Sequence, residues 1–368
     1  MKVIILLHKL SGGGAEHAAT LWAKGFVEKG YDVSIIIKDV SAERSYVLPN
    51  IVQVYGIMND NNGAKWFRYS KAIIKLRKLF VDIYPDVIIS VIQPFGLIAY
   101  FASLGLGIPI VATEHSTFDR PPSSKFSLKS KILRLYANRL MDYVTVLTEA
   151  DHMCINNRFQ RVSVLPEPLA FNPILLSSLN PSLYQRQKVI LACGRLDSWY
   201  YKGFDLLIKA WAKVAGKYAD WRLEIAGSGG GGNMLKVISK QNGVFHQTSF
   251  IGQQQNMVDC YRKASIFVLS SRYEAFGMVL IEAMSQGCAP IACDYKGRQR
   301  EIITSDNEGI ICSVEDVDAI ANAISTLIEN EELRSKIQKG AIERSKFYEL
   351  TRIMDKWDII FKEIGVLV

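Results

Sequence analysis

Short apolar segments rich in β-branched residues alternate with helical patterns along this chain, and this alternation constrains the fold more than any other feature. Strands that are apolar on both faces need cover on both faces, and parallel strands connected by helices provide it. The strands predicted in the first half are Val3–Leu7, Val33–Ile37, Val87–Ile92, Pro109–Thr113, Tyr143–Leu147 and Val162–Leu165. Helical patterns such as Glu16–Lys29 and Trp66–Phe80 lie between them. The first half is therefore predicted to form a parallel sheet with helices on both faces.

The alternation is interrupted around Pro166–Pro181, where prolines are frequent and periodicity is weak, as is typical of a linker. It then restarts with strands predicted at Val189–Cys193, Arg222–Ala226, Ile266–Leu269, Pro290–Cys293 and Ile310–Cys312. The helices predicted there are Phe204–Tyr218, Met257–Lys263, Val279–Gln286 and Val317–Glu329. We expect an α/β protein of two doubly wound, Rossmann-like domains, residues 1–168 and 169–350. A helical pattern around Ile353–Ile364 marks the last segment, residues 351–368.

Composition excludes several classes of protein. A hydrophobic content of 49% with 22% charged residues argues against a disordered chain. No apolar run approaches the ~20 residues that span a bilayer, and the apolar start Met1–His8 is too short for the core of a signal peptide. The six cysteines form no Cys-x-x-Cys pair, which favours small buried side chains in a reducing cytoplasm over disulfides or zinc.

A glycine-rich segment, Ser11-Gly12-Gly13-Gly14-Ala15-Glu16, follows the first predicted strand and opens a helix. Glycines permit a tight turn and a close approach of the backbone to a ligand. The free N–H groups of a helix N-terminus attract anions. The spacing is not that of a nicotinamide-binding loop. A phosphate-binding or sugar-binding loop and a plain tight turn both remain open here.

Candidate ligand-binding groups follow strands of the second half. Gly194 and Arg195 come directly after one strand, and Lys202 precedes a helix. Such cations could neutralise a diphosphate, although surface cations are more often simply solvated. Glu274 and Glu282 lie eight residues apart, one expected in a loop and the other in the helix that follows. The two carboxylates could hold sugar hydroxyls, or they could be ordinary surface glutamates that bind no ligand.

Three further segments allow both a functional and a purely structural explanation. His115 follows a predicted strand and could serve as an acid, a base or a hydrogen-bonding group, although a lone histidine is usually structural. Asp316-Val317-Asp318 has the spacing of a metal-binding motif, but acidic residues at the start of a helix are expected to cap it. Gly227–Gly232 is either a flexible loop or a loop beside a nucleotide.

Taken in order, these segments resemble glycosyltransferase family four, retaining enzymes of the GT-B fold. The resemblance covers nearly the whole chain: SGGGAEH, TEHS, GRLD, KGFDLLIKAW, LEIAGSG, FIG and FVLSSRYEAFGMVLIEAMSQGCAPIA. It implies two Rossmann-like domains that face a central cleft, with the last helix returning to the N-terminal domain. Many members have Asn-Pro where this chain has Glu167-Pro168, so no role is carried over to that position.

The resemblance also implies roles for individual residues. Arg195 and Lys202 would bind the donor diphosphate, Glu274 the transferred sugar and Glu282 the ribose, and His115 would lie near the reacting sugar. The loop with Gly13 and Gly14 would line the cleft. The remaining donor-binding positions would be Gly194, Phe276, Gly277, Met278 and Val279.

The implied reaction is transfer of a hexose or N-acetylhexosamine from a nucleotide sugar, UDP-linked by similarity, to a glycan or lipid-linked acceptor. The anomeric configuration would be retained without a metal or other cofactor, because fixed cations and N–H groups can stabilise the leaving diphosphate. Alternatives are a GT-B-like nucleotide-sugar epimerase or phosphorylase, and a non-catalytic protein that binds nucleotide sugars or polyanions. Nucleic acid is not an expected partner.

The net charge of +8 is concentrated in two stretches without acidic residues, Ala64–Phe80 and Arg120–Arg139. Apolar residues of the first stretch recur at helical spacing, and cations mark another face: Trp66, Tyr69, Ile73, Leu76 and Phe80 against Arg68, Lys71, Lys75 and Lys78. A basic amphipathic helix suits an anionic membrane surface, which the segments Trp66–Phe80 and Arg120–Arg139 could then contact. It equally suits a domain helix whose apolar face lies in the core. A membrane-binding helix would place the protein at the inner face of the plasma membrane. A core helix would leave it in the cytoplasm without membrane contact.

Overall fold

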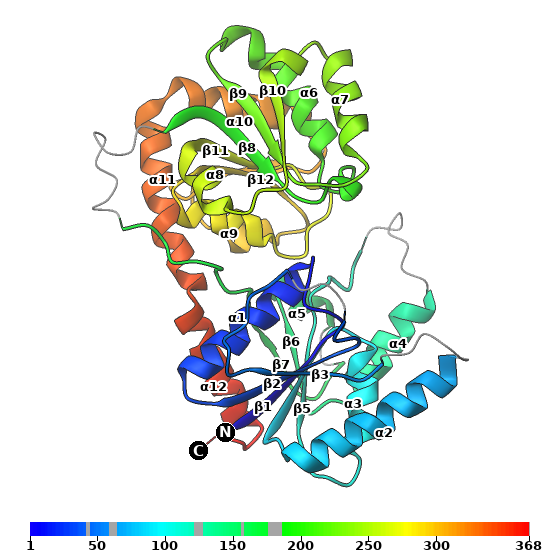
Figure 1. The fold of residues 1–368 in the computed structure, drawn as a ribbon. Helices are drawn as coiled ribbons and strands as arrows, with labels where there is room; N and C mark the ends of the chain where they lie inside the picture. Colours follow the sequence, from blue (N-terminus) through cyan, green and yellow to red (C-terminus); the bar gives the residue numbers. More distant parts are fainter. Residues whose placement is uncertain (42–44, 59–64, 121–127, 156–157, 176–185, 368) are drawn as a thin grey trace. The chain divides into compact units, whose positions relative to one another are not determined.

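The computed structural model describes residues 1–41, 45–58, 65–120, 128–155, 158–175 and 186–367. The chain divides into two compact units, the first formed by Met1–Ala170 with Leu350–Val368 and the second by Phe171–Glu349. Each unit is a parallel sheet with helices packed against its faces (Figure 1). The predicted α/β architecture of two Rossmann-like domains is therefore confirmed.

The first unit contains a seven-stranded sheet in the order β3-β2-β1-β4-β5-β6-β7, and its neighbouring strands pair in parallel. The strands are β1 (Lys2–Leu6), β2 (Asp32–Ile37), β3 (Gln53–Gly56), β4 (Val87–Val91), β5 (Ile110–Thr113), β6 (Tyr143–Val146) and β7 (Val162–Val164). The helices are α1 (Gly14–Glu28), α2 (Lys65–Ile83), α3 (Phe95–Ser103), α4 (Leu128–Asn138), α5 (Glu149–Ile155) and α12 (Leu350–Glu363). The short strand β3, at the edge of the sheet, was not predicted from the sequence.

Successive residues of β1 enter two different cores. Val3 and Ile5 face a core that contains side chains of α1 and α12, whereas Ile4 and Leu6 face one that contains side chains of α2 and α3. Side chains alternate between the two faces of a strand, so the four apolar residues of β1 serve both cores.

The last helix belongs to the first unit. Trp22 of α1 meets Trp357 of α12 edge to face with ring centroids 5.2 Å apart, and Phe26 stacks on Phe361 at 5.5 Å. All four side chains are almost completely buried. The two helices run along the same face of the sheet in Figure 1. The prediction that the C-terminal helix returns to the N-terminal domain is confirmed.

The second unit contains a six-stranded sheet in the order β10-β9-β8-β11-β12-β13, also with parallel neighbours. The strands are β8 (Gln187–Cys193), β9 (Arg222–Ala226), β10 (Thr248–Gly252), β11 (Ala264–Leu269), β12 (Ala289–Asp294) and β13 (Ile310–Ser313). The helices are α6 (Phe204–Val214), α7 (Gly232–Gln241), α8 (Met257–Lys263), α9 (Met278–Ser285), α10 (Val317–Glu329) and α11 (Glu331–Ser345).

Two smaller predictions are also resolved. Asp316 accepts a hydrogen bond from the N–H of Ala319 at 2.8 Å and caps α10, as expected for an acidic residue at that position. Four cysteines are buried, but Cys260 is half-buried and Cys154 is exposed, so the prediction of buried cysteines is wrong for Cys154.

Within the described residues, no helix combines the length and the apolar character that a membrane span requires.

Candidate functional sites

The predicted ligand-binding residues of the second unit gather where its strand order reverses. β8 and β11 are neighbours in the sheet, yet the connections from them run in opposite directions, toward β9 and toward β12. Loops that leave the carboxyl ends of two such strands diverge and open a crevice, the usual ligand position in doubly wound sheets. Gly194 and Arg195 follow β8, and Ser270 and Ser271 follow β11.

An ion pair connects two of these loops. The ammonium of Lys202 lies 2.6 Å from Oε2 of Glu274, and the same oxygen accepts a hydrogen bond from the hydroxyl of Ser271 at 3.2 Å. Both side chains of the pair keep some contact with solvent, 24% for Lys202 and 15% for Glu274. A positive and a negative group are thus held side by side at the carboxyl ends of β8 and β11, within reach of a ligand.

Gly203 allows Lys202 to approach β11 closely. Its φ of 63° is left-handed, and a Cβ atom there would lie 1.9 Å from the carbonyl oxygen of Ser270. The hydroxyl of Ser270 in turn donates to the carbonyl of Lys202 at 3.0 Å. A residue with a side chain at position 203 would force these two backbones apart.

Helix α9 begins beside Glu274. Gly277 caps it with a left-handed φ of 103°, so the N–H groups of the first turn, including those of Met278 and Val279, have no acceptor within the helix. Phe276 directs its ring into the core against Tyr348, and its carbonyl accepts from Gln299. The backbone near this helix end can therefore bind an anion or a sugar oxygen.

Glu282 lies in the second turn of α9 and is only 8% exposed. Its Oε2 accepts a hydrogen bond of 2.9 Å from Tyr261, whose hydroxyl lies 3.3 Å from the sulfur of Cys193. Burial raises the pKa of Glu282, although the hydrogen bond from Tyr261 opposes this, and burial also raises the pKa of Cys193 to about 12. The expected placement of Glu274 in the loop and Glu282 in the helix is confirmed.

The glycine-rich segment Gly227–Gly232 packs against the loop that follows β8. Leu196 donates its N–H to the carbonyl of Ser228 at 2.9 Å, and Gly230 donates to Oδ1 of Asp197 at 2.6 Å. Arg195 directly precedes these residues, and its exposed side chain forms no hydrogen bond or ion pair in the part of the chain described. Its guanidinium is therefore available to a ligand.

Arg272, which was not predicted as a site residue, orders the loop before Glu274. Its guanidinium binds both carboxylate oxygens of Asp205, at 2.7 and 2.9 Å, and lies 4.1 Å from the ring centre of Tyr200. It also donates to Glu315 at 2.8 Å. Asp205, which is buried near the start of α6, could have indicated a nearby cation, because a buried carboxylate requires a cationic or hydrogen-bonding partner.

In the first unit, His115 lies in a buried polar network. Its Nδ1 is 2.8 Å from Oε1 of Glu167 and its Nε2 is 3.0 Å from the hydroxyl of Thr113. The side chains of His115 and Glu167 are each 4% exposed. Both ring nitrogens are therefore engaged by protein groups. The departure from the family pattern at position 167 supplies the partner of this histidine.

The glycine loop before α1 carries an acidic side chain. The carboxylate of Glu16 folds back over Gly13, where a Cβ atom would lie 2.0 Å from its Oε2. Tyr46 holds the loop from the other side by donating to the carbonyl of Gly13 at 3.0 Å. Gly13 thus makes room for Glu16, which was not predicted as a site residue. Gly14 is the first residue of α1.

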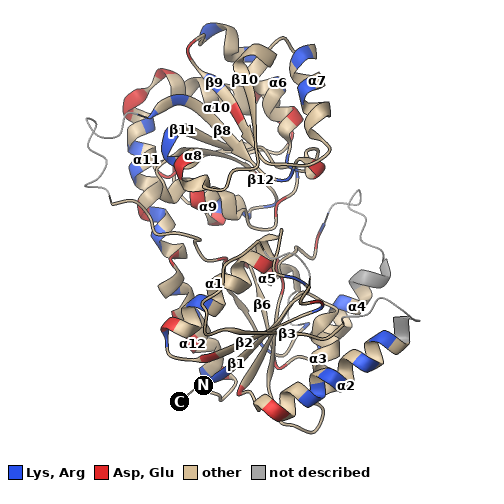
Figure 2. Cartoon of the chain, in the orientation of Figure 1, with Lys and Arg blue, Asp and Glu red and all other residues tan. Residues whose placement is uncertain are grey.

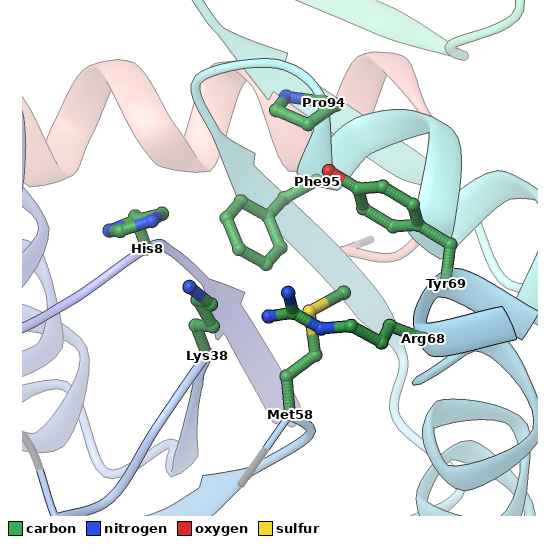
Figure 3. A pocket seen from close by; sticks show the side chains of 7 residues that line it. All are labelled: His8, Lys38, Met58, Arg68, Tyr69, Pro94 and Phe95. Atoms are coloured by element: carbon green, nitrogen blue, oxygen red, sulfur yellow. The ribbon is translucent and has the colours of Figure 1, made fainter. Parts of the chain in front are cut away.

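A cavity of about 250 Å³ lies where β1, β2, β3 and β4 end (Figure 3). It is lined by His8, Lys38, Met58, Arg68, Tyr69, Pro94 and Phe95. A second cavity, of about 160 Å³, shares His8, Pro94 and Phe95 with the first and is also lined by Glu16 and Gln93. His115 lines neither of the two. The cavities were missed because their residues are scattered over four strand ends, each without a recognisable motif.

The apolar residues of the two basic stretches lie partly in the core of the first unit, whereas several of the cations are exposed. Leu76 and Phe80 of α2 are fully buried against the sheet, as in the core reading. Arg134 of α4 is also buried, donates to Glu114 at 2.6 Å and lies over the ring of Phe118. The side chain of Trp66 and residues 121–127 lie outside the described part of the chain. The cations of α2 that remain exposed include Lys71, Lys75 and Lys78 (Figure 2).

Two family models match the chain. Residues 12–167 match the model described as Glycosyltransferase Family 4, and residues 180–344 match Glycosyl transferases group 1. Each model therefore covers most of one structural unit.

Individual proteins of known name are similar over the full length. A Campylobacter jejuni enzyme, the GalNAc-alpha-(1->4)-GalNAc-alpha-(1->3)-diNAcBac-PP-undecaprenol alpha-1,4-N-acetyl-D-galactosaminyltransferase, is 26% identical and matches 99% of both chains. The sucrose-phosphate synthase of Thermosynechococcus elongatus superposes with a TM-score of 0.82 at 16% identity, covering 99% of this chain and 98% of that one. HepE of Anabaena in complex with UDP and glucose gives a TM-score of 0.79 at 18% identity, covering 98% and 99%.

Proposed function

Because this chain belongs to the GT4-type glycosyltransferases, with the GT-B fold, we propose that it transfers a hexose or N-acetylhexosamine from a UDP-sugar to a glycan or lipid-linked acceptor with retention of configuration. Glycosyltransferase activity in polysaccharide or lipid-linked glycan synthesis follows from the family and its relatives. The proposed transfer uses a uridine nucleotide, retains the anomeric configuration and needs no metal.

The observation that carries the proposal is the arrangement around Lys202 and Glu274. A cation, a carboxylate and the open N-terminus of α9 lie together at the reversal of strand order in the second unit. A nucleotide sugar presents a diphosphate next to sugar hydroxyls, and these need cations with N–H groups for the first and an acceptor for the second. The site therefore offers complementary groups for both parts of the donor.

Each group has a defined role in the proposed reaction. Lys202 and Arg195 bind the diphosphate and stabilise the charge that develops on it as the glycosidic bond breaks. Glu274 accepts hydrogen bonds from hydroxyls of the transferred sugar. Glu282 binds the ribose, and its contact with Tyr261 fixes the orientation of the carboxylate.

UDP is proposed as the nucleotide because HepE, a structural neighbour, is known in complex with UDP and glucose. A lipid-linked acceptor is proposed because the Campylobacter jejuni relative is named for an undecaprenol-linked substrate. The leaving diphosphate would accept the proton of the acceptor hydroxyl on the same face, since none of the described side chains near the site is placed as an evident covalent nucleophile.

Incubation with radiolabelled UDP-sugars and extracted bacterial lipids tests the proposal. We expect label to move into the lipid fraction in the presence of a chelator, with the α configuration of the donor kept in the product. Interconversion of the sugar without transfer would instead establish an epimerase. Tight binding without either reaction would establish a non-catalytic binding protein.

A second proposal concerns the surface of α2. Phe67, Ile74 and Val81 recur every seven residues and are each at least 45% exposed, with Lys71, Lys75 and Lys78 beside them. An exposed apolar strip between lysines suits the headgroup region of an anionic membrane. We expect anionic liposomes to retain the protein at low salt and neutral liposomes to release it. Equal retention on both would contradict this proposal.

A further inference from the structure

The two adjoining cavities of the first unit differ in chemical character, and this difference indicates a particular class of acceptor. We propose that the larger cavity binds a negatively charged group, a carboxylate or a phosphate, of the acceptor molecule. The inference rests on the proposed function insofar as it assumes a glycan acceptor. It adds that this acceptor is acidic and that Lys38 and Arg68 recognise its charge.

The charge of the larger cavity comes from two elements far apart in the sequence. Lys38 follows β2, and Arg68 projects from the first turn of α2. Figure 3 shows the guanidinium of Arg68 directed toward Lys38, with the charged ends of both side chains below the ring of Phe95 in the view. Like charges repel, so two cations brought together in this way gain from an anion placed between them.

Lys38 is the central residue. It is half-buried, and its ammonium forms no hydrogen bond or ion pair with any described residue. A partly buried ammonium without a protein partner loses hydration and gains nothing in return, unless a ligand supplies the counter-charge. Its charge is felt by His8 across the cavity, because burial first and Lys38 second lower the pKa of that histidine. At neutral pH, His8 thus offers a neutral imidazole to the ligand.

Around Lys38, the described lining of the cavity contains no carboxylate. The remaining walls are formed by Met58, Pro94, Phe95 and Tyr69. Apolar walls reduce the local dielectric screening and strengthen the attraction between a bound anion and the cations. Helix α3 begins at Phe95, so the positive end of its dipole faces the same region.

The smaller cavity is mostly apolar, with Leu7, Val91 and Ile92 in its lining, and it carries one carboxylate in place of the two cations. That carboxylate is Glu16, and a second polar residue is Gln93, whose Oε1 is buried and has no hydrogen-bond partner in the described structure. Both groups accept hydrogen bonds, as needed for sugar hydroxyls. Since His8, Pro94 and Phe95 border both cavities, one ligand can span them, with its anionic group near Lys38 and its hydroxyls near Gln93.

The size of the cavities limits what is bound. At about 250 Å³ and 160 Å³ each lies below the roughly 300–1,000 Å³ typical of sites for drug-sized ligands. Together they suit a single acidic sugar or a sugar phosphate. A longer acceptor would extend beyond them.

Calorimetric titration with three probes tests the inference: methyl β-glucuronide for the carboxylate, glucose 6-phosphate for the phosphate, and methyl β-glucoside as the neutral control. We expect at least one anionic probe to bind about tenfold or more tightly than the glucoside, because the neutral probe lacks the charge-assisted contacts. The preferred anionic probe identifies the source of the charge. Equal affinity for all three, or no binding of any anionic probe, would overturn the proposal.

Three variants locate the binding. Lys38→Met is expected to weaken the anionic probe about tenfold, and Lys75→Met, which removes an equal charge from the exposed face of α2, to leave it unchanged. Lys202→Met should also leave it unchanged, because that residue belongs to the second unit. Loss in Lys202→Met with retention in Lys38→Met would assign the anion to the donor site and refute the inference. Thermal unfolding of each variant verifies its fold.

Failure of this proposal can be distinguished from failure of the proposed function. Donor turnover without lipid or glycan, followed as release of free UDP from UDP-sugars, depends on the second unit. If UDP is released but anionic probes are ignored, the transferase proposal stands and the acidic acceptor is excluded. If anionic probes bind but no UDP-sugar is consumed, the cavity assignment stands and the transferase proposal fails.

Discussion

The ammonium of Lys202 and the carboxylate of Glu274 form a 2.6 Å ion pair between the loop that precedes α6 and the loop that precedes α9. Each partner also has a second contact, because the carbonyl of Lys202 accepts from Ser270 and the carboxylate of Glu274 accepts from Ser271. The pair is thus anchored to the residues that follow β11. A ligand would meet two opposite charges whose positions are already fixed, which limits the reorganisation needed on binding.

Lys202→Met should abolish most donor turnover while the protein remains folded. Loss of one fixed group that stabilises developing charge typically lowers kcat about 10²–10³-fold. The free energy of unfolding should fall by only about 1 kcal/mol or less, because the pair is partly solvated and Glu274 keeps its bond to Ser271. Release of UDP from UDP-sugars, measured beside thermal unfolding, checks both expectations.

Lys213→Met is the matched control for this prediction. Lys213 also pairs with a carboxylate of the second unit, that of Asp318, but both side chains are about half-exposed or more and neither belongs to the site. Turnover should remain at the level of the unmodified protein. Near-normal turnover in Lys202→Met itself would mean that the donor site lies elsewhere.

Gly203→Ala should destabilise the second unit and reduce turnover together. The new Cβ atom would lie 1.9 Å from the carbonyl oxygen of Ser270, at a left-handed φ that alanine adopts reluctantly. Gly216→Ala is the comparison, because a Cβ atom there meets nothing within 4 Å. Thermal unfolding should show a clear loss for position 203 and little change for position 216. Equal effects at both would contradict the close approach at Ser270.

The fold was predictable because each strand of the core is a nearly continuous apolar segment. Residues such as Ile4 and Ile5 are buried on opposite faces of β1, which leaves a pattern that can be read locally. Gln53–Gly56 and Thr248–Gly252 were missed because they are edge strands with half-buried residues and no such pattern.

The two sites differ in how far the sequence could indicate them. Lys202 and Glu274 lie in recognisable segments, and their pairing follows once the loops after β8 and β11 are adjacent. Lys38 and Arg68 come together only in the folded unit, where the segment after β2 and the first turn of α2 line one cavity. The burial of His115 depends on Glu167, a residue for which the family pattern suggested no role.

Glu282→Gln should change the pH dependence of stability. Burial raises the pKa of Glu282 above its ordinary value of 4.5, so the folded state binds this proton more tightly than the unfolded state. The resulting stabilisation is present below that ordinary value and is lost as the pH rises through the folded pKa. Relative to the unmodified protein, the glutamine variant should therefore become more stable as the pH rises above 4.5, the ordinary pKa of the group.

Urea unfolding at several pH values measures this difference. Glu332→Gln serves as the control, because Glu332 is exposed at the start of α11 and is remote from Tyr261 and Glu282 in the chain. The stability difference of the control should change little over the same range. A constant difference for Glu282→Gln would show that its carboxylate is ionised equally in both states.

His115→Ala should impair stability more than a catalytic role alone would predict. Removal of the imidazole leaves the carboxylate of Glu167 buried, and its Oε2 already lacks a hydrogen-bond partner among the described residues. An unsatisfied buried acceptor costs about 1–3 kcal/mol, and more when it is charged. His152→Ala, at an exposed histidine of α5 that pairs with Glu149, should cost almost nothing.

The double variant His115→Ala/Glu167→Ala separates a structural role from a catalytic one. If the histidine serves mainly to satisfy Glu167, removal of both partners should recover part of the lost stability, because no charge remains buried and unpaired. Turnover of UDP-sugars should then recover in parallel. A histidine that contacts the reacting sugar would instead leave turnover low in both variants, with the stability of His115→Ala nearly unchanged. Chemical unfolding and UDP release, measured on the same preparations, distinguish these outcomes.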